Sequence, residues 1–255
     1  MSTPARPVRP LTSLVDLIEQ PLALRRPQRF VIDPKQLDLF DGRISEPALR
    51  QVWRTMHLAA ERGHVFQVWS RHVERMAALV PALNRALLSD RRDAPRELRN
   101  LWLGAAMSTQ QEADERAPLL LGIDASIHFA WCVPLRAELA LDPYLQDGRK
   151  IGWVVAGGGE SPPHPVWLTK LRLACEAHRI PFSFSGWGVW MPAEDAPGEA
   201  LNDASTVIVD PDGSVREGGV AGFGRVMARA GQSQRGRLLD GRVWDAVPDP
   251  EQNRY

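Results

Sequence analysis

The sequence predicts an α/β protein built around a parallel sheet. Two observations support this class: short apolar runs typical of strands alternate with helical patterns, and the alternation repeats about every thirty residues. Crossovers between parallel strands are right-handed, so the chain can form either a doubly wound sheet or a (β/α) barrel. The residues by themselves do not separate these two architectures.

Six segments are predicted to be strands. Each is a dense apolar run that gives way to polar residues, glycine or proline. In chain order, the predicted strands are Arg29–Ile32, Val65–Trp69, Leu101–Leu103, Ile127–Trp131, Ile151–Val155 and Phe182–Phe184.

Helical patterns fill the intervals between these strands. Ser45 is a candidate N-cap with Pro47 in the first turn, and apolar residues follow at helical spacing over 49–60. A helix predicted over 73–88 contains Pro81, which we expect to kink or split it. The remaining predicted segments are a short helix over 14–22, helices over 110–121 and 165–179, and a charged connector over 90–99.

Both ends of the chain differ from this pattern. Residues 1–13 contain prolines separated by arginines and are predicted to be an extended or disordered lead-in. From residue 192 the chain becomes loop-like, and the turn residues 210–213 predict a β-hairpin between Thr206–Val209 and Ser214–Arg216. The predicted division is therefore a lead-in over 1–13, an α/β domain over 14–191 and a C-terminal β/coil extension over 192–255.

Composition limits the function classes. The 31 basic and 31 acidic residues balance, so there is no bulk electrostatic attraction to nucleic acid. No apolar run approaches the ~18 residues that span a membrane, and the first twenty residues lack a secretion signal, so we expect a cytoplasmic protein without a membrane partner. The two cysteines form no Cys-x-x-Cys pair, which argues against a disulfide scaffold or a cysteine-built metal site.

Six segments carry a family resemblance along roughly residues 20–250. They are QLDLFDG (36–42), VFQVWSRHVERM (65–76), LWLGAAMSTQQEADERAPLLL (101–121), WVVAGGGES (153–161), IPFSFSGWGVWMP (180–192) and GRLLDGRVWDAVP (236–248). In this order they resemble the phage and bacterial family named after phage gene products thirty-seven and sixty-eight, a radical-SAM-like and uncharacterised family.

The resemblance implies a fold and a cofactor chemistry. It implies an incomplete (β/α) barrel of about six parallel strands, like the radical-SAM core but without the first strand and the cluster loop. Full family members carry a three-cysteine motif for a [4Fe–4S] cluster that binds S-adenosylmethionine, and such clusters need thiolate ligands. This sequence has no cysteine before Cys132, so no cofactor is predicted for this chain.

Three alternative functions are considered. The first is a cluster-less, non-catalytic or partner-dependent ligand-binding accessory protein of phage or prophage origin. The second is an enzyme: either an active S-adenosylmethionine-dependent radical enzyme whose cysteine motif precedes the given start or belongs to another chain, or one that performs cluster-free chemistry through Glu160 and Cys132. The third is an interaction module for nucleic acid or protein.

The best local candidate for a small-molecule site is the run from Gly157 to Ser161. Gly158 and Gly159 permit close approach of a ligand to backbone N–H groups, and Glu160 can bind an amino group or act as a base. Ser161 completes the run. The alternative is a plain glycine-rich turn.

Other candidate ligand-binding residues follow predicted strands. Gln110 and Asp114 lie one helical turn apart and can either bind a polar ligand or pair locally. Trp187, like its neighbour Trp190, lies in a glycine-rich segment and is predicted to be free for a ligand. Arg71 follows the second predicted strand.

No catalytic or metal-binding residue is assigned. His128 and Cys132 lie on one face of a predicted strand, roughly 13 Å apart at ~3.3 Å per residue, which is poor chelate geometry. Cys175 lies on the apolar face of a predicted helix and is expected to be a core thiol.

Two partner interactions are considered. A barrel without its first strand exposes a sheet edge, so we expect a homodimer or a partner chain to cover it. An arginine-rich stretch over 220–242 can contact phosphates. Its one aromatic residue, Phe223, gives little support for base stacking, so a solvated segment is the alternative.

Overall fold

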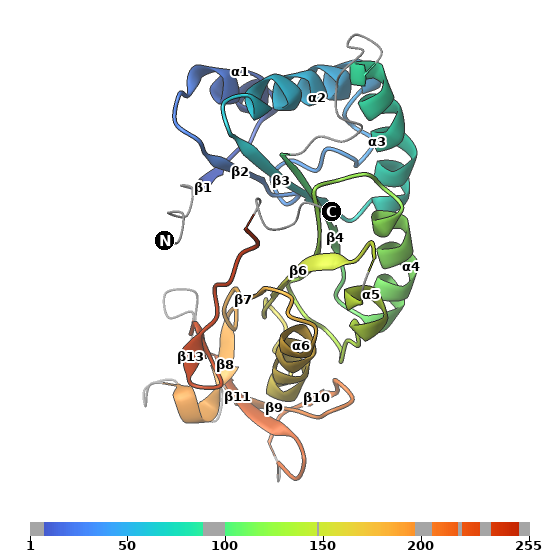
Figure 1. Cartoon of the computed structure of the whole chain (residues 1–255). Helices are drawn as coiled ribbons and strands as arrows, with labels where there is room; N and C mark the ends of the chain where they lie inside the picture. The colour runs from blue at the N-terminus through green and yellow to red at the C-terminus, as the bar shows by residue number, and fades with distance from the viewer. Residues whose placement is uncertain are drawn as a thin grey trace. The chain divides into compact units, whose positions relative to one another are not determined.

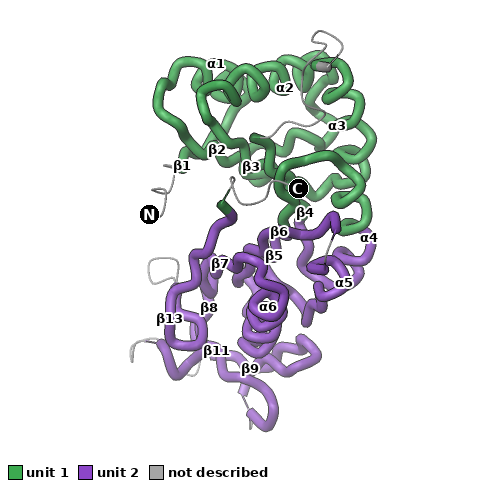
Figure 2. The backbone as a smooth tube through the Cα atoms, viewed as in Figure 1, with its two compact units in different colours: residues 1–105, 116–129, 249–255 green, residues 106–115, 130–248 purple. Residues whose placement is uncertain are grey.

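The computed structural model describes residues 8–88, 100–146, 148–196, 206–218, 221–229 and 236–249 of the 255-residue chain. The predicted charged connector over 90–99 lies outside the described residues. Contacts between Cα atoms divide the chain into two compact units, which Figure 2 colours separately: residues 1–105, 116–129 and 249–255 form unit 1, and residues 106–115 and 130–248 form unit 2. The predicted boundary at residue 191 lies inside unit 2.

The main sheet has seven strands whose order follows the chain, β1 to β7. The strands are β1 (Val8–Pro10), β2 (Arg29–Ile32), β3 (Val65–Ser70), β4 (Leu101–Ala106), β5 (Ile127–Cys132), β6 (Ile151–Ala156) and β7 (Phe182–Phe184). Parallel pairing joins β1 to β2, β2 to β3, β3 to β4 and β6 to β7. A doubly wound sheet reverses its strand order at a switch point, and this sheet does not. The topology is therefore that of an incomplete (β/α) barrel, as the resemblance implied.

Helices connect the strands (Figure 1). They are α1 (Leu14–Ala23), α2 (Glu46–Ala60), α3 (Val73–Leu88), α4 (Gln110–Leu121), α5 (Asp142–Leu145) and α6 (Pro165–Ala177). α2 begins after Ser45 with Pro47 in its first turn, as predicted, although the Ser45 side chain makes no capping hydrogen bond. Pro81 does not split α3, which continues through it. The expected split is wrong, because buried apolar residues on both sides of the proline keep the helix continuous, whereas a kink at Pro81 stays a prediction.

Strand burial agrees with a parallel sheet. Every residue of β3 and β6 is buried, and those sequences read as nearly continuous apolar runs. Polar residues follow the strands where they end. The loops that carry the candidate site residues therefore begin at the ends of buried strands.

Of the two alternatives for the N-terminal lead-in, extended or disordered, Val8–Pro10 take the extended one. These residues form β1, and the amide N–H of Leu11 continues the ladder to the carbonyl of Val31 at 2.9 Å. All three residues of β1 are exposed, so the segment lacks the alternating pattern that would have identified a strand. Val8–Pro10 form a strand because their backbone pairs with that of β2.

The C-terminal extension contains antiparallel strands. β8 (Trp190–Pro192), β9 (Thr206–Val209), β10 (Val215–Arg216) and β11 (Arg225–Arg229) form a sheet of order β10-β9-β11-β8, a short 3₁₀ turn (Ala193–Asp195) follows β8, and β12 (Leu238–Leu239) pairs with β13 (Arg242–Val243). The predicted hairpin is confirmed, because Val209 pairs with Val215 around the turn at 210–213. In the part of the chain that the structure describes, no helix has both the length and the apolar character needed to cross a membrane.

Candidate functional site

The ends of β4 to β7 are joined to one another within unit 2. The amide of Arg136 donates to the carbonyl of Ser108 at 2.9 Å, which links the loops after β5 and β4. The amide of Gly157 donates to Cys132 at 3.2 Å, and the amide of Ser185 donates to Ala156 at 2.9 Å. In (β/α) barrels this carboxyl edge carries the functional residues. We call these joined loops the strand-end edge.

The glycines after β6 allow two backbone segments to touch. A Cβ atom on Gly158 would overlap the carbonyl oxygen of Trp187, and one on Gly188 would overlap the backbone of Gly159. The Gly158 amide donates to the carbonyl of Gly186 at 2.9 Å. That amide is already bonded within the protein, so the glycine run is explained by close packing rather than by an open phosphate cradle.

The segment opens to solvent only at its end. Glu160 and Ser161 are exposed, and Gly159 is half-buried. The carbonyl of Glu160 accepts a hydrogen bond from the indole Nε1 of Trp190 at 2.7 Å. The guanidinium carbon of Arg229 lies 5.9 Å from the Trp190 ring centroid. We call Glu160, Ser161, Trp190 and Arg229 the Glu160 face; it combines an acidic, an aromatic and a basic side chain in one unit.

Gln110 and Asp114 are close, as predicted, but they hold a loop. The Gln110 amide group donates to the carbonyl of Ala140 at 3.3 Å and accepts from the amide of Ala140 at 2.8 Å. Asp114 accepts from Gln110 at 2.8 Å and from the Tyr144 hydroxyl at 3.0 Å. This arrangement supports the local-pairing alternative, because the pair ties α4 to the chain before α5.

Two predicted site residues lie elsewhere. Trp187 is only 2% exposed; its indole N–H donates to the carbonyl of Leu238 at 2.9 Å, and its ring packs against Phe184. The prediction that Trp187 is free for a ligand is therefore wrong, since the C-terminal chain covers it. Arg71 is exposed but belongs to unit 1, whereas the Glu160 face belongs to unit 2.

The helix N-termini of the strand-end edge are capped by the protein itself. At α4, the hydroxyl of Thr109 accepts from the amide of Glu112 at 3.3 Å, and the Glu112 carboxylate accepts from the amide of Ser108 at 2.6 Å. Glu112 also pairs with Arg136 at 3.0 Å. At α6, His164 Nδ1 accepts from the amide of Val166 at 3.2 Å. These caps use donors that would otherwise attract an anion.

Both cysteines are core thiols. Cys132 and Cys175 are 0% exposed. Burial raises the pKa of the Cys132 thiol far above its usual range, with smaller contributions from Cys175 and Glu112, and burial raises the pKa of Cys175 to about 12. His128 is also buried, with Nε2 2.8 Å from the carbonyl of Ile123. Neutral, enclosed thiols are poor nucleophiles and poor metal ligands.

The residues of this chain do not fit a [4Fe–4S] cluster. Such a cluster is held by several thiolates, whereas the sequence contains two cysteines and both are buried as neutral thiols. Among the described residues, no three His, Cys, Asp or Glu side chains are grouped so that they could hold a metal ion.

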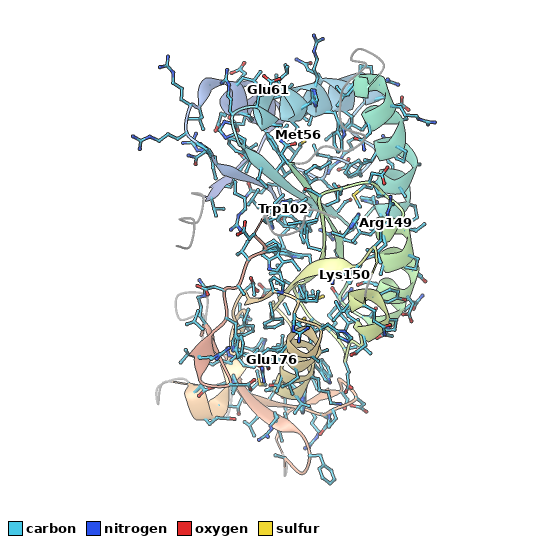
Figure 3. All side chains as sticks on the ribbon, in the orientation of Figure 1. Met56, Glu61, Trp102, Arg149, Lys150 and Glu176 are labelled. Atoms are coloured by element: carbon cyan, nitrogen blue, oxygen red, sulfur yellow. The ribbon has the colours of Figure 1, made fainter. Side chains whose placement is uncertain are left out.

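The arginine-rich stretch is partly involved in stacking. The Arg242 guanidinium carbon lies 3.4 Å from the ring centroid of Trp244, and that of Arg172 lies 4.6 Å from the same centroid. Arg172 also pairs with Glu176, which Figure 3 labels in unit 2. Arg235 lies outside the described residues. Part of this stretch therefore fastens the C-terminal chain to α6.

Two aspartates that join separate segments through hydrogen bonds were not identified from the sequence. In unit 1, buried Asp38 accepts from the hydroxyl of Ser70 at 2.7 Å and so links the loops after β2 and β3. In unit 2, Asp240 accepts from Thr169 at 2.9 Å and from Arg172 at 2.8 Å. Both aspartates lie in segments that carry the family resemblance, which was the available signal.

Comparison with known proteins identifies a family. A family model described as "Protein of unknown function (DUF5131)" matches residues 9–248. No curated protein and no solved structure matches the chain. Because the matched region covers most of the sequence, the chain belongs to the DUF5131 family.

Proposed function

We propose that this chain is a cluster-less, radical-SAM-like protein of a phage or prophage family, which binds a small molecule at its strand-end edge and is non-catalytic without a partner. The sequential parallel strand order supports the barrel relationship. One observation carries the functional part. The chain's only two thiols are enclosed and neutral, whereas the Glu160 carboxylate stands exposed at the edge where barrel enzymes bind substrates.

The Glu160 face is suited to a ligand with a positive amino group. The exposed carboxylate can accept charge-assisted hydrogen bonds, and the half-buried Trp190 ring, bonded to the main-chain carbonyl of Glu160, offers an apolar surface. Arg229, near the Trp190 ring, can meet a carboxylate of the same ligand. An amino acid or an amino-acid-bearing molecule has this combination of groups.

S-adenosylmethionine is the probe that tests this proposal. It carries an amino-acid moiety, and it is the molecule that radical-SAM enzymes cleave to start their reactions. Calorimetric titration of the chain is expected to show binding. Glu160→Gln, which removes one charge-assisted hydrogen bond, should weaken it about tenfold or more. The matched control is Glu194→Gln, an exposed carboxylate of the same unit outside the Glu160 face. Absence of binding, or equal binding by Glu160→Gln, contradicts the proposed site.

The non-catalytic part has a separate readout. Under anaerobic reducing conditions, the chain alone is expected to cleave no S-adenosylmethionine beyond a protein-free blank. Reductive cleavage by the chain alone contradicts the proposal and favours the active radical enzyme.

A further inference from the structure

His164 is a buried histidine whose imidazole has a defined protonation state. It is 1% exposed and stands at the N-cap of α6. Its Nδ1 accepts the hydrogen bond from the amide of Val166, so Nδ1 carries no proton. The neutral imidazole therefore has its proton on Nε2. That atom is buried.

Charged groups from three other segments face this imidazole. They are Arg225 at the start of β11, Asp210 in the turn after β9, and Glu138 in the loop after β5. Asp210 pairs with Arg216, and Glu138 pairs with Lys170. Both carboxylates are thus shared with cations that partly offset their attraction for an imidazolium.

Burial dominates the balance at His164. It lowers the pKa of the imidazole below its ordinary value of 6.5, and Arg225 lowers it further. The carbonyl of Phe223, Asp210 and Glu138 act in the opposite direction, but less than burial does. The α6 N-terminus also disfavours a positive charge at this position.

The same end of α6 holds the β9–β10 hairpin. The indole Nε1 of Trp167 donates to the carbonyl of Pro211 in the hairpin turn at 3.1 Å. A Cβ on Gly213 would lie 3.2 Å from the Trp167 ring, so the turn rests directly on the indole. The rings of His164 and Trp167 are 5.8 Å apart. The hairpin turn and the imidazole therefore both lie against the Trp167 indole.

We infer that His164 is a pH-sensitive latch, which keeps the β9–β10 hairpin on α6 while its imidazole is neutral and releases it when the imidazole is protonated. A proton on Nδ1 removes the acceptor for the Val166 amide. It also places a buried positive charge beside Arg225 and at the positive end of the helix. Moving the hairpin away from α6, together with β11, to which β9 stays paired, lets water reach the imidazolium.

The direction of the pH effect follows from the two states. Above pH 6.5 the imidazole is neutral in both the docked and the released state, so pH does not change their ratio. Below pH 6.5 the exposed imidazole of the released state takes up a proton that the docked state excludes. Each further pH unit then raises the released population about tenfold, until the lowered pKa of docked His164 is reached.

Nuclear magnetic resonance of the full chain tests the latch. The Cε1–H signal of His164 and the indole N–H signal of Trp167 are followed from pH 8 to pH 5. His164 is expected to titrate below pH 6.5, and the Trp167 indole signal is expected to move with it toward a solvent-exposed position. His164→Asn keeps a capping oxygen but cannot titrate in this range, so its Trp167 signal should stay constant. The matched control His178→Gln, at the other end of α6, should behave as the wild type.

Two results overturn the latch. One is titration of His164 at or above pH 6.5, and the other is an unchanged acid transition in His164→Asn. If His164→Asn does not fold, hydrogen exchange of the wild-type chain decides. The protection of the Trp167 indole N–H, whose hydrogen bond to Pro211 is lost on release, should fall about tenfold between pH 6.5 and pH 5.5 after correction for intrinsic exchange, while that of the β6 amides stays constant. Equal protection at both pH values contradicts the latch.

Discussion

Cys132 and Cys175 determine, at the scale of single residues, whether this chain has a thiolate of its own. Both thiols are enclosed and their pKa values are raised by burial, so neither provides a thiolate at neutral pH. A cysteine-based nucleophile or cluster ligand would require the opposite environment, with partial exposure and a lowered pKa.

Thiol titration checks this environment. We expect an aromatic disulfide reagent at pH 8 to leave both thiols of the native chain unmodified, and to modify two thiols per chain after unfolding. Ser161→Cys is the positive control, because position 161 is exposed and a thiol there should react at once. Rapid modification of Cys132 in the native wild type would show that the thiol is accessible.

Residue roles were the least predictable part of the candidate site. The proximity of Gln110 and Asp114 follows from helical spacing. Their other partners, Ala140 for Gln110 and Tyr144 for Asp114, each lie thirty residues further along the chain. Trp187 was misjudged because the chain that covers it, around Leu238, is distant in sequence. Helical spacing fixes near neighbours, whereas burial depends on long-range packing.

At the scale of elements, the loops after β6 and β7 are held together by close backbone contact, and this contact is part of the strand-end edge. Gly158 is placed against the backbone of Trp187, where no side chain fits. We expect Gly158→Ala to lower the free energy of unfolding by about 3 kcal/mol, because backbone must move to admit the methyl group. Chemical denaturation measures this loss.

A second glycine provides the control for that substitution. Gly122, after α4, has its nearest neighbouring atom 3.3 Å from an added Cβ, so Gly122→Ala should change the free energy of unfolding by less than about 1 kcal/mol. If Gly158→Ala is equally mild, the glycine run is not required for packing, and its conformational freedom would then be available for a ligand.

Strand positions were predictable because apolar runs and sheet burial coincide, as in β3 and β6. The two-residue strands β12 and β13 could not be found in this way. Asp240 and Gly241, both at positive φ, form the turn between them, and Arg172 holds the Asp240 carboxylate. A hairpin this short is defined by its turn and its anchors rather than by periodicity.

At the scale of the whole molecule, the two ends of the main sheet differ. The β7 end is covered, because Ser183 bridges to Asp245 and the amide of Phe184 donates to Trp244 at 2.8 Å. At the other end is β1, where Pro10 lacks an N–H. The backbone N–H of Leu11 points toward β2. Because N–H directions alternate along a strand, the backbone nitrogens of Val8 and Pro10 lie on the side of β1 away from β2. Pro10 therefore removes one donor from the outer side of β1.

Because the β7 end is covered, we expect a second copy or a partner chain to pair with the β1 edge of the main sheet. A substitution at Pro10 tests this expectation. Pro10→Ala adds an outward N–H, and in a symmetric dimer the two added hydrogen bonds should strengthen self-association about tenfold. Light scattering over a range of concentrations measures the dimer fraction. The matched control is Pro143→Ala, an exposed proline in α5. Monomers of both wild type and Pro10→Ala at high concentration would show that the β1 edge does not mediate association.

The central claim is that this chain does not by itself hold the cluster of a radical enzyme. Anaerobic iron–sulfur reconstitution, followed by iron analysis and a visible absorption spectrum, tests it most directly. We predict no stoichiometric iron and no charge-transfer band, because both thiols are enclosed and neutral. About four iron atoms per chain with a charge-transfer band would contradict the account. That result would mean that these two cysteines, or a second copy of the chain, supply cluster ligands.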